Sequence, residues 1–138
     1  MRKEIMNDYG LLVLRIGLAL LMLPHGLTKT GLLFSGNEIQ FPDPLGFGAT
    51  VSLLLAVMAE VLCSFLILVG FKVRFAVIPL IVTMLVAIFF VHVNDPWVKS
   101  ELAVLYLLGY VVLAITGEGR FSLQQWLTRI HNSGSGKE

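Results

Sequence analysis

Four long apolar stretches dominate the hydrophobic pattern of the chain, at about residues 9–29, 47–71, 75–93 and 101–116. A helix needs about 20 mostly apolar residues to cross a hydrocarbon core of ~30 Å, and each stretch approaches that length. The stretches lack the alternating polar residues of a transmembrane β-strand, and they are too few to close a barrel. The pattern therefore predicts an all-α, polytopic membrane protein whose four transmembrane helices form a bundle.

A shorter amphipathic segment follows the fourth stretch. Ser122 with Gln125 three residues later forms a capping-box pattern for a helix start. The apolar residues of this segment gather mostly on one face, which is typical of a helix at the membrane interface: Phe121, Leu123, Trp126, Leu127 and Ile130. We expect a single membrane domain over residues 1–131 that ends in this interfacial helix at 122–131. The Gly- and Ser-rich residues 132–138 have the composition of a disordered tail.

Basic residues are unevenly distributed between the two ends of the predicted helices. Two, Lys29 and Lys99, flank the outer ends, whereas seven flank the end that carries both termini and the second link: Arg2, Lys3, Lys72, Arg74, Arg120, Arg129 and Lys137. Short loops rich in Lys and Arg stay on the cytoplasmic side of a membrane. The distribution predicts that both termini are cytoplasmic.

Composition agrees with a lipid bilayer as the main partner of the chain. Hydrophobic residues make up 57% of the sequence and charged residues 14%, against about 25% charged in soluble domains. A net charge of +1 offers no basic field for nucleic acid, so nucleic-acid binding is excluded. The single cysteine, Cys63, excludes an intrachain disulfide and a paired-cysteine redox motif.

Two charged residues lie far inside the first and second stretches. Counted from the outer ends at ~1.5 Å per residue, Arg15 is about 21 Å deep and Glu60 about 20 Å deep. A guanidinium and a carboxylate at one depth on neighbouring helices predict an intramembrane ion pair between Arg15 and Glu60. In the alternative interpretation, Glu60 is a proton acceptor or a ligand contact that Arg15 tunes.

A polar cluster of His25, Lys29, His92, Asp95 and Glu101 is predicted near the outer surface, beneath the long link of residues 30–46. It draws on three helices, and lipid and bundle interiors both penalise such groups, so we expect them to bind a ligand head group. Together with the deeper carboxylate, the ligand-binding candidates are His25, Lys29, Glu60, His92 and Glu101.

A quinone suits this predicted site. Its carbonyl or hydroxyl group would hydrogen-bond to histidine, and Glu101 would exchange protons with His92. Its ring is expected among four side chains, those of Leu21, Met22, Phe89 and Tyr106. A bis-histidine haem is disfavoured and no metal site is predicted, because the histidines and carboxylates have no fixed local spacing. The alternative is an interfacial hydrogen-bond network without a ligand.

The order of the polar motifs resembles the DoxX family over nearly the whole chain. The motifs that carry the resemblance are Arg15, the run His25-Gly26-Leu27-Thr28-Lys29, Glu60, the run Leu68-Val69-Gly70-Phe71 with Arg74, His92, the run Glu101-Leu102-Ala103-Val104-Leu105-Tyr106-Leu107, and the run Gly117-Glu118-Gly119-Arg120-Phe121-Ser122-Leu123. The resemblance implies a small four-helix protein of the bacterial inner membrane. It also implies a link to quinol oxidase and thiosulfate:quinone oxidoreductase systems, from which the family takes its name.

Two functions are therefore open at the level of sequence. In the first, the chain is a membrane component of an oxidoreductase or quinone-linked redox system, with redox partner proteins, and its bundle holds a quinone or another small lipophile. In the second, it is a non-catalytic accessory or scaffold protein that recruits partners through its helix faces. Gly10 and Gly17 on the first helix and Gly109 on the fourth would allow close helix contacts, including those of a homo-oligomer. A small transporter is a weaker third alternative.

Overall fold

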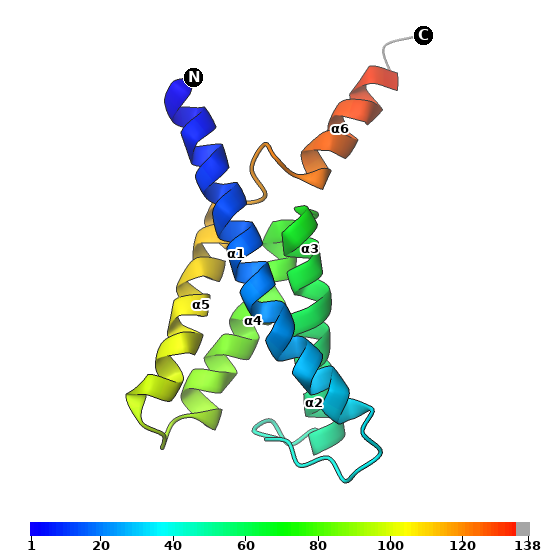
Figure 1. The fold of residues 1–138 in the computed structure, drawn as a ribbon, viewed down its shortest axis with the longest axis vertical. Coiled ribbons are helices and arrows are strands. Elements are labelled where there is room, and N and C mark those ends of the chain that lie inside the picture. The colour runs from blue at the N-terminus through cyan, green and yellow to red at the C-terminus, as the bar shows by residue number, and fades with distance from the viewer. Residues whose placement is uncertain (135–138) are drawn as a thin grey trace.

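The computed structural model describes residues 1–134, in which all the regular secondary structure is helical and there is no strand (Figure 1). Two of its helical segments, η1 and η2, are π-helical and continue the α-helices that precede them. The elements in chain order are α1 (Arg2–Leu33), α2 (Ala49–Val57), η1 (Met58–Cys63), α3 (Ser64–Val69), α4 (Val73–Val86), η2 (Ala87–Val91), α5 (Trp97–Thr116) and α6 (Leu123–Gly134).

Four helical segments of this part of the chain are long and apolar enough to cross a membrane. They are Arg2–Leu33, Ala49–Val69, Val73–Val91 and Trp97–Thr116. Large apolar side chains also cover their outer faces: Val13, Phe65, Phe75 and Ile115, one from each span, are each more than half exposed. Water would penalise such a surface on every helix, whereas lipid does not. The predicted all-α membrane bundle is confirmed.

The first and fourth helices begin earlier than the apolar stretches from which they were predicted, whereas the second span, Ala49–Val69, lies within its predicted stretch. The first begins at Arg2 and not near residue 9, because hydropathy marks the span and says little about where backbone hydrogen bonding begins. The fourth begins at Trp97, directly after Pro96, which has no N–H to pair and is well tolerated at a helix start.

The core lies where α1 crosses the second span and where α4 packs along α5. Close approach of α1 to α5 depends on Gly109, since a Cβ there would lie 2.7 Å from Leu18 Cδ1. The buried apolar cluster consists of Ala19, Met22, Ala59, Ile67, Val73, Ala76, Val77, Leu80, Met84, Ala103, Tyr106, Tyr110 and Leu113.

Both π-helical segments lie where candidate site residues stand. Glu60 is inside η1, and His92 directly follows η2. A π-helical turn inserts an extra residue into the hydrogen-bond ladder, which turns the side chains around it, and such turns are frequent at functional sites. The sequence pattern predicted continuous α-helices here and missed both.

The start of α1 and the helix α6 lie at the same end of the bundle, opposite the long link (Figure 1). At this end the chain reverses between α3 and α4 through Gly70, whose φ of 75° favours glycine. The final helix, α6, projects away from the bundle, and none of its residues is buried. As the capping-box pattern indicates, Ser122 Oγ accepts a hydrogen bond from Gln125 N at 3.3 Å. Residues 132–134, which we predicted to belong to a disordered tail, are helical in the structure. The remaining residues of that predicted tail, 135–138, lie outside the described residues.

Candidate functional site

A partly open apolar cavity of about 590 Å³ lies between the helices in the half of the bundle near the long link. Its walls come from α1, α2, η1, α4, η2 and α5, and residues of the link cover it. Most of the lining is aliphatic or aromatic. The ionisable side chains that reach it are those of His25, Lys29, Glu60, His92, Lys99 and Tyr106.

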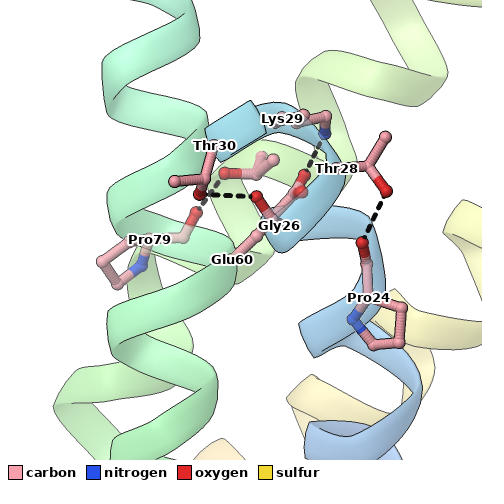
Figure 2. Close-up of polar contacts among 8 residues, drawn as sticks. Pro24, Gly26, Thr28, Lys29, Thr30, Glu60 and Pro79 are labelled. Atoms are coloured by element: carbon pink, nitrogen blue, oxygen red, sulfur yellow. Dashed lines mark hydrogen bonds and ion pairs between the residues drawn. The ribbon is translucent and has the colours of Figure 1, made fainter. Parts of the chain in front are cut away.

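The deepest polar group of the cavity is the carboxylate of Glu60, which is 2% exposed. Lys29 Nζ, from the last turns of α1, donates a hydrogen bond to Glu60 Oε1 (Figure 2). Glu60 Oε2 is also buried and has no hydrogen-bond partner within residues 1–134. The ion pair neutralises a charge that would be costly to bury alone, and it leaves one acceptor unused.

This ion pair depends on a close approach of α1 to η1 at Gly26. A Cβ on Gly26 would lie 2.7 Å from Val61 Cγ2 and 3.1 Å from the backbone carbonyl carbon of Glu60. Lys29 follows three residues later on the same face of α1, so it can reach Glu60. Thr30 Oγ1 donates to the Gly26 carbonyl oxygen at 2.9 Å in the same turn (Figure 2).

The structure corrects the predicted ion pair between Arg15 and Glu60. Arg15 Nη1 donates to the carbonyl oxygen of Glu118, and Nη2 donates to that of Phe121 at 2.8 Å. Arg15 precedes Gly26, the helix neighbour of Glu60, by 11 residues, which is about 16 Å along α1. The depth estimate failed because α1 continues past Lys29 to Leu33 and therefore places Arg15 nearer the end of the bundle where α1 begins.

Arg15 instead holds the connection between α5 and α6. Its guanidinium packs against Gly70, where a Cβ would lie 2.6 Å from Nη1. The Gly70 carbonyl oxygen in turn accepts from Gln124 N at 3.1 Å. A buried guanidinium with several donors can bind backbone carbonyls that no helix satisfies. Arg15 is therefore a structural residue on the opposite half of the bundle from the cavity.

The predicted outer cluster is brought together only in part. His25, Lys29 and His92 line the cavity, whereas Glu101 does not and is exposed on α5. His25 meets Tyr106 edge to face, with ring centroids 6.2 Å apart.

Asp95 takes the place predicted for Glu101 beside His92. His92 Nδ1 lies 2.8 Å from Asp95 Oδ2, and Lys99 Nζ lies 3.5 Å from Asp95 Oδ1. The hydrogen bond from His92, and then the charge of Lys99, lower the pKa of the Asp95 carboxyl. The difference arises because Asp95 lies in the short turn directly after His92, within reach of its ring.

The apolar surroundings also differ from those predicted. Met22 and Tyr106 line the cavity, but Leu21 is 65% exposed and Phe89 63% exposed on the outside of the bundle. Helix phase decides this, because adjacent residues such as Leu21 and Met22 point about 100° apart.

The long link covers the cavity with apolar residues, among them Phe41, whose ring lies 5.9 Å from Lys29 Nζ. Asp43 attaches the link to the start of α2. Its Oδ1 accepts from Ser52 Oγ at 2.8 Å and from Phe47 N at 3.0 Å, and its Oδ2 accepts from Gly48 N at 2.8 Å. These hydrogen bonds lower the pKa of the Asp43 carboxyl, and the hydrogen bond from Ser52 has the largest effect. The sequence did not point to Asp43, because it lies five residues before Gly48, the N-cap residue of α2, and so gives no local capping signal.

Within residues 1–134, no three His, Cys, Asp or Glu side chains converge in a way that could hold a metal ion.

A model of the DoxX family matches residues 10–93, more than half of the chain. The chain belongs to the DoxX family. The DoxX match runs from within α1 to the end of η2 and contains Lys29, Glu60 and His92. It confirms the family seen in the sequence, whereas the motifs at 101–107 and 117–123 lie outside the matched residues. Neither a search of curated proteins nor a search of solved structures finds a match to the chain.

Proposed function

We propose that this DoxX protein is an integral membrane component of a quinone-linked redox system and binds a quinone or a similarly small lipophile in its cavity. One observation carries the proposal: an apolar cavity of about 590 Å³ inside the bundle places Glu60, Lys29 and His92 on its wall. Small-molecule sites are generally built this way, with an apolar lining and a few polar groups that orient the ligand. Redox partner proteins would act on the bound ligand.

Each polar residue has a distinct role in this proposal. The ring of the ligand would lie against Met22 and Tyr106, and its polar group would meet Lys29 and Glu60. His25 and His92 would hydrogen-bond to the ligand near the mouth of the cavity, and Asp95 would orient the His92 ring. Glu101 is left out, because it does not line the cavity.

The proposal is tested by titrating the detergent-purified protein with menadione and with ubiquinone-1, using protein-free micelles as the partition blank. We expect saturable binding that His25→Ala and His92→Ala each weaken while the protein still folds. Ala56→Phe should also block binding, because Ala56 lines the cavity, whereas Leu21→Phe on the lipid-facing surface should bind as the wild type does. Binding that stays unchanged in Ala56→Phe would refute the cavity as the site.

We further propose that the protein lies in the bacterial inner membrane with both termini in the cytoplasm. The support is the excess of Lys and Arg at the end of the bundle where α1 begins and α6 lies (Figure 1). In this orientation the cavity and the long link face the outer side. The apolar residues of α6, which include Trp126 and Ile130, are exposed and suit a helix lying in the inner leaflet.

A scaffold function without a ligand is the second candidate, and two observations favour it. None of the residues of α6 is buried. A Cβ on Gly10 or Gly17 would meet no atom within 4 Å in the described part of the chain, so that face of α1 can accept another helix. A protein that binds no lipophile but forms a dimer, which Gly10→Leu and Gly17→Leu disrupt, would support this function over the first.

A further inference from the structure

The carboxylate of Glu60 is only half satisfied in the folded protein. Lys29 donates to Oε1, whereas Oε2 accepts no hydrogen bond from residues 1–134 although it is buried. A buried acceptor without a donor has lost its hydration and receives nothing in return. Glu60 is one of the residues that line the cavity, so a ligand held there lies close to this half-satisfied carboxylate.

His92 offers a second acceptor on the wall of the same cavity. A carboxylate only accepts hydrogen bonds, so the Nδ1 atom that lies 2.8 Å from Asp95 Oδ2 carries the proton. In the neutral ring, Nε2 is then an acceptor.

Building on the function proposed above, we propose that the cavity selects lipophiles whose polar group is a hydroxyl, such as phenols and quinols. A hydroxyl donates to Glu60 Oε2 and also presents its own oxygen to the remaining N–H groups of Lys29. A methyl ether has no proton to give, so it fills the same apolar space but leaves Oε2 unpaired. A quinone carbonyl can accept from Lys29, but it too leaves Oε2 without a donor.

The experiment compares two probes with the same apolar body, 4-hexylphenol and its methyl ether 4-hexylanisole. Each is equilibrated by dialysis with full-length protein in dodecylmaltoside micelles, and binding is corrected with protein-free micelles. A hydrogen bond to a charged group contributes enough that we expect the phenol to bind the wild type at least about tenfold more tightly than the ether. Glu60→Gln replaces the unused acceptor by an amide that can present N–H, so the preference should fall below about threefold. Glu38→Gln makes the same chemical change on the exposed link and should keep the wild-type preference.

Each outcome decides between the two proposals. Equal binding of phenol and ether to the wild type overturns hydroxyl selection but leaves the lipophile-binding function intact. A preference that survives in Glu60→Gln overturns the role of Glu60. If neither probe binds saturably, both the proposed function and the hydroxyl selection are overturned. Because the comparison of the two probes on the wild type is decisive by itself, the result does not depend on the Glu60 variant folding.

Discussion

Gly26 is the position at which a single added methyl group should damage the candidate site most directly. The Cβ of an alanine would lie 2.7 Å from Val61 Cγ2, 3.0 Å from Glu60 Cβ and 3.1 Å from the Glu60 carbonyl carbon. Carbon atoms in good packing stand roughly 3.5–4.0 Å apart. The Val61 side chain can rotate, but the Glu60 backbone cannot move unless α1 and η1 separate.

The expected cost follows from two opposing terms. Overpacking of a tight contact costs about 1–3 kcal/mol, whereas alanine in a helix is more favourable than glycine by about 1 kcal/mol. Gly17→Ala is the matched control, because it lies on the same helix and its Cβ would meet no atom within 4 Å in residues 1–134. The helix-propensity term is common to both variants and cancels between them. Gly26→Ala should therefore be less stable than Gly17→Ala by about 1–3 kcal/mol.

Stability is measured by unfolding of the purified variants in mixed micelles with increasing SDS, followed by circular dichroism. Binding of 4-hexylphenol is measured on the same samples, and we expect it to weaken only in Gly26→Ala, because Lys29 then stands farther from Glu60. If Gly26→Ala proves as stable as Gly17→Ala and binds the phenol equally well, the close approach at Gly26 does not hold the ion pair together.

Three further predictions test the other half of the bundle, the link and the topology. Arg15→Ala should expose the α5–α6 connection to trypsin at Arg120 and cost about 1–3 kcal/mol of stability for each carbonyl left unpaired, whereas Arg2→Ala on the exposed first turn should do neither. The stability losses of Arg15→Ala and Glu60→Ala should be additive in the double variant. Strong coupling between the two substitutions would instead indicate the Arg15–Glu60 pair that the structure does not show. The lowered pKa of Asp43 means that its ionised form stabilises the link above the ordinary carboxyl pKa of about 3.9 and that this contribution is lost as pH falls through the lower, folded-state value. Asp43→Asn should therefore melt at a lower temperature than the wild type at pH 7 and converge with it toward pH 3, and a constant difference across that range would contradict this explanation. A reporter fused after Arg129 should be active in the cytoplasm and one inserted near Asn37 outside it; the reverse pattern would show that the basic residues do not set the orientation.

The sequence by itself determined that the protein is a four-helix membrane bundle. Apolar runs near 20 residues leave few alternatives, because a backbone in lipid must satisfy its hydrogen bonds within a helix or a closed barrel. It also pointed to four of the ionisable residues that line the cavity, because ionisable residues in apolar helices are rare. These are His25, Lys29, Glu60 and His92.

Only the tertiary structure decided which of these residues meet. The membrane depth counted from the sequence placed Arg15 level with Glu60. In the packed helices, however, Lys29 pairs with Glu60, and Arg15 donates hydrogen bonds to the carbonyl oxygens of Glu118 and Phe121. Depth along a helix is a one-dimensional estimate, and it contains neither the crossing of α1 over the second span nor the π-helical turn that carries Glu60. Those features arise from contacts between segments far apart in the chain, such as Gly26 against η1, and no local pattern encodes them.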